Sequence, residues 1–344
     1  MKRAKSNRSW KKRLLWYLYL VLLIPLCLEL CLWIVGGRPY SEEIYHIEIE
    51  PENAFIGDPS LGIALRPGEY DITLNEEVHF HTTHLTEGRR KVAFKTDSSY
   101  EKRISILGCS YTYGYGVNDD EHFTSLLQKE FPTYNFSNHG VIGYGTSQSY
   151  LQCKELCESA DKPDEIFLMF SAAHFDRNTM TPQYRRAMGI GFGRSMDRNP
   201  EGMSEASFPY YTLEDERLKL NQVKWSEMYE DWWGRSFSAS INWLQTQMEI
   251  YERHQMKVVE VTAALIREMN ENCQEAGIDF KLFILDNSDE TNELSLILDK
   301  EDIKTLDIDF NFNDGDLTNS PYDEHPNPKG HQYITNKIIH FLEE

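Results

Sequence analysis

A candidate nucleophile, Ser110, stands between an apolar segment and a predicted helix. Residues 104–108 alternate as a short buried strand does, and the run ends in small, turn-capable residues. A serine at such a junction lies at the carboxyl edge of a sheet, where open α/β folds place their chemistry. The alternative is an ordinary turn with a solvated serine. A serine hydroxyl becomes nucleophilic only when a base takes its proton, a third group orients that base, and donors stabilise the oxyanion.

The strongest candidate base is His325, in the segment Asp-Glu-His-Pro-Asn-Pro-Lys-Gly-His at 323–331. This segment precedes the predicted C-terminal helix. Asp323 stands two residues before the histidine, a spacing that lets a carboxylate meet the imidazole of a nearby turn. The alternative is a helix-capping loop that carries a surface histidine.

Two further loops are expected to end at the same sheet edge. Residues 138–146 are rich in glycine, so the N–H of Gly143 can approach a developing oxyanion. Residues 171–178 follow another apolar strand, and there His174 can donate a hydrogen bond from its ring.

Two other sets of side chains compete for a chemical role. Cys109 is an alternative nucleophile, although adjacent side chains on an extended segment point in opposite directions. His79 and His81 share one face of a predicted strand with His84 nearby, but no carboxylate or cysteine partner stands at a fixed spacing, so we interpret them as surface histidines and not as a metal site.

The elements that must position these residues alternate between strand and helix. An apolar stripe over 123–131 predicts a helix capped by Asp119 or Asp120, and another helix is expected from 146 or 147. Residues 237–276 are expected to be helical with a break near 254–255, and Asn327-Pro328 opens a final helix. The remaining expected strands cover 134–136, 165–170, 278–285 and 303–310. Such alternation predicts an α/β fold, a three-layer α/β/α arrangement with a parallel sheet.

Two regions depart from this alternation. Residues 37–100 are expected to be a small β-rich leader before a main domain at 101–344, with short strands near 45–49, 70–74, 78–81 and 92–94. Residues 179–236, rich in Arg, Met, Trp, Tyr and Gly, interrupt the main domain. This insertion is either a lid or substrate platform, or a packed subdomain of mixed loops.

Residues 14–35 are apolar and long enough to cross a membrane as one helix. The basic tail at 1–13 precedes them, which predicts a cytoplasmic N-terminus and places residues 37–344 in the periplasm or the extracellular space. A cleaved signal peptide is the competing interpretation. Glu29 lies off the centre of the span, and either faces a partner helix or reaches toward the outer interface.

The net charge and the number of cysteines limit the classes of function and fold to which the chain can belong. The net charge is −20, and beyond residue 36 the chain carries 28 basic and 54 acidic residues, which argues against nucleic acid as a partner. Six cysteines in 344 residues do not make a disulfide framework. Cys153 and Cys157 are four apart in a predicted helix, a poor spacing for a bridge.

Four blocks follow one another in a specific order. They are Gly-x-Ser-x-Thr-x-Gly at 108–114, Asn-x-Gly-x-x-Gly at 138–143, a polar residue after the strand 165–170, and Asp-x-His-Pro-Asn-x-x-Gly-His at 323–331. This order resembles that of the SGNH (GDSL-type) hydrolases over about residues 104–344, and poorly within 179–236. The leader, with Asp-Pro-Ser-Leu-Gly at 58–62 and Gly88-Arg89, is also similar to segments that precede such domains in membrane-anchored bacterial members.

The resemblance implies that Ser110 is the nucleophile and His325 the general base, with the N–H groups of Ser110 and Gly143 in the oxyanion hole. The family's Asn of the third block is His174 here, and a neutral imidazole in the right tautomer supplies the missing donor. The family's acid usually stands three residues before the histidine, at Tyr322 here. Either Asp323 orients His325 instead, or a backbone carbonyl does.

The expected activity is acyl-ester cleavage through a Ser110 acyl-enzyme, with no metal or organic cofactor. Acylated glycans of the envelope, lipids and small esters are the candidate substrates. Two alternatives stay open: an acyltransferase acting on an extracellular polysaccharide, and a non-catalytic binding or scaffold protein on the same fold.

Overall fold

The computed structural model describes residues 4–41, 45–94, 99–198 and 200–343. The chain divides into two compact units. The smaller unit combines residues 1–44 with 230–252, and the larger combines 45–229 with 253–344. Residues 1–3 of the expected basic tail lie outside the described residues.

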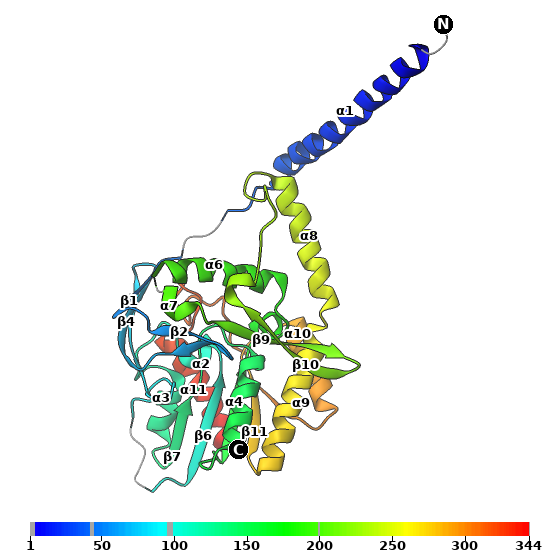
Figure 1. The fold of residues 1–344 in the computed structure, drawn as a ribbon. Coiled ribbons are helices and arrows are strands. Elements are labelled where there is room, and N and C mark those ends of the chain that lie inside the picture. The colour runs from blue at the N-terminus through cyan, green and yellow to red at the C-terminus, as the bar shows by residue number, and fades with distance from the viewer. Residues whose placement is uncertain (1–3, 42–44, 95–98, 199, 344) are drawn as a thin grey trace. The chain divides into compact units, whose positions relative to one another are not determined.

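The larger unit is built on a five-stranded sheet in the order β12-β11-β8-β6-β7. All four pairings are parallel, as expected when helices connect successive strands (Figure 1). The central strand β8 is buried over all six residues, which explains its continuous apolar sequence. The strands are β6 (Lys102–Gly108), β7 (Tyr134–Asn138), β8 (Glu165–Phe170), β11 (Asp279–Ile284) and β12 (Thr305–Asp307).

Helices cover both faces of this sheet. On one face, α4 (Thr146–Glu158), α9 (Val258–Ala276) and α10 (Asp289–Asp299) share a hydrophobic cluster with Leu107, Ile166 and Leu168. On the other face, α3 (Phe123–Glu130) and α11 (Pro328–Glu343) pack with Ile106, Phe167 and Met169. The side chains of each strand alternate between the two clusters, so the predicted three-layer α/β/α arrangement is confirmed.

The leader forms small antiparallel sheets. One has the order β1-β4-β5, and β2 pairs with β3. The expected strand at 92–94 is wrong, because the Ala93 N–H donates to Ser125 Oγ (2.9 Å) and leaves no ladder to join. The bounds are β1 (Ile47–Glu50), β2 (Phe55–Asp58), β3 (Gly62–Leu65), β4 (Gly68–Leu74) and β5 (Val78–His84).

The insertion is largely helix and hairpin. Its elements within the larger unit are α6 (Pro182–Arg198), α7 (Pro200–Met203), the antiparallel pair β9 (Ser207–Glu214) and β10 (Arg217–Lys224), and the 3₁₀ turn η1 (Trp225–Glu227). Phe208 and Trp225 of the insertion belong to the same hydrophobic cluster as Phe55 of the leader and Tyr113. The leader and this part of the insertion therefore share one core.

Two predicted helix starts have different outcomes. Asn327 caps α11 as expected, because its Oδ1 accepts from the N–H groups of Lys329 (2.9 Å) and Gly330 (3.1 Å). The expected cap of α3 is wrong. His122 is the N-cap, with Nδ1 accepting from the Ser125 N–H (3.2 Å), because the carboxylate of Asp119 is committed to Arg90.

The smaller unit contains α1 (Ala4–Ile34) and the first part of α8 (Ala239–Gln255). Within α1, Trp10–Ile34 is long and apolar enough to cross a membrane. Glu29 of this helix accepts hydrogen bonds from Ser238 Oγ (2.7 Å) and from the N–H groups of Ala239 (2.8 Å) and Ser240 (2.9 Å). Its carboxylate therefore caps the start of α8.

Candidate active site

Ser110 is the first residue of the short helix α2 (Ser110–Tyr113), directly after β6. The strand ends at Gly108, which has a φ of +153°. A Cβ at this position would lie 2.2 Å from Thr112 Oγ1, so there is no room for a side chain. Cys109 is extended and precedes the helix. The chain thus turns sharply at the carboxyl edge of the sheet, and Ser110 retains 6% of its surface there.

Ser110, His325 and Asp323 form one chain of hydrogen bonds. His325 Nε2 lies 2.9 Å from Ser110 Oγ, and His325 Nδ1 lies 2.8 Å from Asp323 Oδ1. A carboxylate only accepts, so Nδ1 carries the proton and Nε2 is free to accept from the serine hydroxyl. The backbone N–H of His325 also donates to Asp323 Oδ1 (2.8 Å), which fixes the loop around the pair.

The other oxygen of Asp323 is bound by a residue of the leader. Tyr45 donates from its hydroxyl to Asp323 Oδ2 at 2.5 Å. Burial alone raises the pKa of Asp323, but the hydrogen bonds from His325 and Tyr45 outweigh it and leave this pKa below its ordinary value. Burial and the adjacent carboxylate raise the pKa of Tyr45, so the phenol stays a donor.

Aromatic rings enclose the imidazole. The ring centroids of Tyr111 and Tyr115 lie 5.2 Å and 5.0 Å from that of His325. Both tyrosines follow Ser110 in the same turn. Two aromatic rings therefore pack against the imidazole, and their low polarity strengthens the hydrogen bonds beside them.

The two candidate donors to the oxyanion, Gly143 and His174, have different surroundings. Gly143 has φ +75°, and its carbonyl accepts from the Tyr184 hydroxyl (2.8 Å), while its N–H donates to none of the described residues. His174 is buried, its Nδ1 lies 3.2 Å from Thr146 Oγ1, and its Nε2 has no partner among the described residues. Burial lowers the pKa of His174 well below its ordinary value, so the ring is neutral.

Cys109, the competing nucleophile, is wholly buried and stands next to Arg177. Burial disfavours the charge on Arg177, but Cys109, Tyr184 and Tyr111 nearby raise its pKa overall. The guanidinium also donates to the Tyr144 carbonyl (2.8 Å). His325 pairs with Ser110, so the geometry favours the serine.

Two side chains to which the sequence analysis gave no individual role hold the nucleophile turn. Arg90, fully buried, donates to the carbonyls of Tyr113 (2.8 Å), Gly114 (2.5 Å) and Val117 (2.7 Å) and pairs with Asp119 (3.2 Å). Asn138 donates to the Thr112 carbonyl (2.7 Å). A leader arginine and the second block thus shape the turn after Ser110, and the Gly88-Arg89-Arg90 run was the available signal.

The histidines of β5 do not gather into one site. His79 bonds Thr73 (2.8 Å) and His81 bonds Asp71 (2.9 Å), and both are exposed. His84 is buried and lies between the Arg66 carbonyl (3.1 Å) and the Tyr113 hydroxyl (2.8 Å). Each ring therefore has a structural partner of its own.

A pocket of about 380 Å³ lies beside Tyr115. Its walls come from the leader, the second block and the insertion, and most of them are apolar. They are Ile47, Glu48, Ile49, Glu52, Asn53, Phe55, Ile63, Tyr115, Ile142, Met203 and Trp225. The pocket thus adjoins both the ring that packs on His325 and the residue before Gly143.

No family model matches the chain, and no curated protein matches it. Among solved structures, one similar chain is a putative lipolytic protein of the G-D-S-L family from Desulfitobacterium hafniense, at 13% identity and TM-score 0.39, covering 69% of this chain and 98% of that one. Another is a psychrotrophic esterase from Pseudoalteromonas sp., at 15% identity and TM-score 0.38, covering 71% and 97%. A carbohydrate esterase matches at 12% identity and TM-score 0.40, covering 88% and 98%.

The sheet order places β6 and its serine turn beside the central strand β8, with only the edge strand β7 on the other side. The chain has a three-layer α/β/α fold with a parallel sheet. In this fold the first three sequence blocks follow the strands β6, β7 and β8, and the fourth precedes the last helix, α11. The likeness to the solved structures is distant and carries no argument about activity.

Proposed function

We propose that the larger unit is a serine esterase that cleaves acyl esters through a covalent acyl-enzyme on Ser110. The observation that carries the proposal is the hydrogen-bond chain from Ser110 Oγ to His325 Nε2 (2.9 Å) and from His325 Nδ1 to Asp323 (2.8 Å). A base within hydrogen-bond reach of a hydroxyl, itself oriented by a carboxylate, is the requirement for activating a serine.

In the proposed reaction, Ser110 Oγ attacks the ester carbonyl carbon and its proton passes to His325 Nε2. Asp323 stabilises the resulting imidazolium through the bond to Nδ1. The tetrahedral intermediate collapses when His325 returns the proton to the leaving alkoxide, and the alcohol departs. Water, deprotonated by His325, then attacks the acyl-enzyme, and the carboxylic acid leaves as Ser110 regains its proton.

The developing oxyanion needs donors that are fixed in advance. We assign this role to the N–H groups of Ser110 and Gly143 and to Nε2–H of His174. The ring of His174 is neutral and its Nε2 has no partner in the described part of the chain, and both observations support its assignment. Arg177, beside Cys109, adds positive charge close to the nucleophile turn.

The substrate's apolar part would occupy the pocket beside Tyr115. A volume of about 380 Å³ is at the small end of ligand sites and suits a short acyl chain or one sugar ring. Acylated glycans, lipids and small esters all carry such a group.

We place the larger unit outside the cytoplasm, held by α1. The apolar span Trp10–Ile34 and the basic residues before it support this topology. The surface of residues 232–251 supports it further. Gln245 and Glu249 of α8 are buried while Trp243, Met248 and Tyr251 are exposed, the reverse of a helix in water. A lipid surface beside α1 would cover these side chains.

The test is covalent labelling of the detergent-solubilised full chain with a fluorophosphonate. We expect labelling of the wild type and of Cys109→Ala, and none of Ser110→Ala, with all three unfolding at similar temperatures. Labelling that disappears in Cys109→Ala and persists in Ser110→Ala would assign the cysteine instead. A folded wild type that is never labelled would contradict the catalytic proposal and support a binding or scaffold protein.

Acyl transfer is the second candidate function, favoured by the low exposure of Ser110, 6%, which restricts water at the acyl-enzyme. Product analysis with a sugar alcohol present separates the two. Free acid as the main product supports hydrolysis, and acylated sugar as the main product supports transfer.

A further inference from the structure

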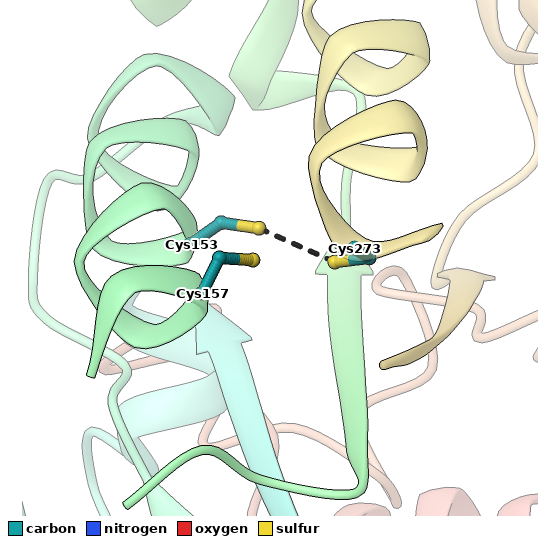
Figure 2. A group of neighbouring side chains, drawn as sticks. All are labelled: Cys153, Cys157 and Cys273. Carbon is teal, nitrogen blue, oxygen red and sulfur yellow. Dashed lines mark hydrogen bonds between the residues drawn. The ribbon is translucent and has the colours of Figure 1, made fainter. Parts of the chain in front are cut away.

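Three cysteines lie close together between two helices, and none of them has a role in the proposed reaction. Cys153 and Cys157 lie one turn apart on α4, and Cys273 lies on α9, as Figure 2 shows. Their three Sγ atoms all lie within 4.8 Å of one another, and Cys153 Sγ is 3.5 Å from Cys273 Sγ. Outside α1 the sequence holds four cysteines, and three of them belong to this cluster; the fourth is Cys109.

The surroundings of the three thiols distinguish between a metal and a disulfide. Cys153 and Cys273 are wholly buried members of the hydrophobic cluster on this face of the sheet. A metal site would place up to three thiolates there, and an excess of negative charge in an apolar core is costly. A disulfide is neutral and suits this core.

We propose that Cys153 and Cys273 form a disulfide that ties α4 to α9, and that Cys157 is a third thiol able to replace Cys153 in the bond. In the cell this rests on the proposed location outside the cytoplasm, where disulfides persist. The poor spacing of Cys153 and Cys157 within one helix does not matter, because the partner comes from a helix 120 residues further along the chain.

The bond forms by two thiol–disulfide exchanges with a small disulfide, such as oxidised glutathione. The Cys153 thiolate attacks one glutathione sulfur, and the first glutathione thiolate leaves. The Cys273 thiolate then attacks Cys153 Sγ, and the second glutathione thiolate leaves. The two thiol protons end on the two released glutathiones, whose disulfide has taken up the two electrons.

The link would stabilise the part of the fold that carries the oxyanion loop. Helix α4 begins at Thr146, three residues after Gly143, and α9 packs beside it. Closing a long loop restricts the unfolded chain, so reduction should lower the unfolding temperature by about 5–15 °C. Activity at low temperature should change little, because none of the three thiols contacts Ser110 or His325 among the described contacts.

The test starts from reduced, unfolded full-length chain that is refolded in detergent with oxidised and reduced glutathione. Remaining thiols are blocked with N-ethylmaleimide under denaturing conditions, the chain is reduced, and new thiols receive iodoacetamide before peptide mass spectrometry. We expect iodoacetamide on Cys153 and Cys273 and N-ethylmaleimide on Cys157. Cys157→Ser should keep the bond and its thermal shift, Cys153→Ser should pair Cys157 with Cys273, and Cys273→Ser should lose both.

Two results would overturn the proposal. One is N-ethylmaleimide on both Cys153 and Cys273 in correctly refolded protein. The other is stoichiometric zinc or copper in protein purified without chelator, lost in Cys157→Ser. The refolding assay does not depend on where the protein resides or on catalysis. A disulfide formed in vitro and absent from cells would therefore contradict the proposed location alone, and a failed fluorophosphonate reaction would leave the disulfide result standing.

Discussion

The hydroxyl of Tyr45 donates to Asp323 Oδ2 at 2.5 Å, across 278 residues of sequence. The leader thus completes the hydrogen-bond chain that runs from Ser110 through His325 to Asp323. Because this bond stabilises the ionised carboxylate, it helps to keep the pKa of Asp323 below its ordinary value. The ionised form therefore contributes stability that is complete above the unfolded pKa and is lost as the pH falls through the folded one.

Tyr45→Phe removes that donor and keeps the ring. We expect the pKa of Asp323 to rise, so the acid limb of the pH–rate profile moves to higher pH and kcat falls about tenfold at neutral pH. Rates of p-nitrophenyl acetate hydrolysis from pH 4 to 9 measure both effects. Tyr322→Phe, at an exposed neighbour of Asp323, is the control and should match the wild type. An unshifted acid limb in Tyr45→Phe would show that the bond does not affect the acid.

His174 is expected to act as an oxyanion donor. His174→Ala should lower kcat by about 10²–10³ with little change in KM, because a transition-state donor is lost. His174→Asn, which restores a donor and the family's usual residue, should recover most of that loss. Equal losses in both variants, with equal unfolding temperatures, would mean that the ring has another role.

Arg90 is expected to dominate the stability of the nucleophile turn. Arg90→Met leaves three buried carbonyls and Asp119 without their partner, and should lower the free energy of unfolding by about 3–5 kcal/mol. Arg89→Met, one residue earlier and partly exposed, should change it by less than about 0.5 kcal/mol. Urea unfolding followed by tryptophan fluorescence makes the comparison, and similar losses in both variants would contradict the assignment.

Glu29 is expected to hold the start of α8 by accepting from two N–H groups and two hydroxyls of Ser238, Ala239 and Ser240. In Glu29→Leu the N–H groups of Ala239 and Ser240 lose their acceptor, so their hydrogen exchange in detergent should accelerate at least tenfold. Leu30→Ala, at an exposed position of the same helix, should leave that exchange unchanged. Protection that survives in Glu29→Leu would show that the cap is dispensable.

The pocket beside Tyr115 is expected to select the acyl group. Ile49→Trp fills part of it from β1 and should lower kcat/KM for a butyryl ester about tenfold, while an acetyl ester is affected less than about twofold. Parallel losses for the two esters would place the acyl group elsewhere.

The candidate catalytic residues could be predicted from the sequence for two reasons. The proposed reaction sets their residue types, and the strands and helices next to them set their positions along the chain. Ser110 after β6 and His325 before α11 are local signals of this kind. The contributions of Tyr45 and Arg90 could not be predicted from the sequence, because each depends on a contact between the leader and a distant loop. A long-range contact also explains one error, because Asp119 pairs with Arg90 and so does not cap α3. The expected strand at 303–310 retains only Thr305–Asp307.

The distance along the chain between Ser110 and His325, 215 residues, has a consequence for biosynthesis. The imidazole is supplied 215 residues after the serine, so a nascent chain holds an inert serine until the segment with His325 has been synthesised. Contacts of such long sequence separation also slow folding. An enzyme of this kind would become reactive only after the segment with His325 has emerged and folded against the serine turn.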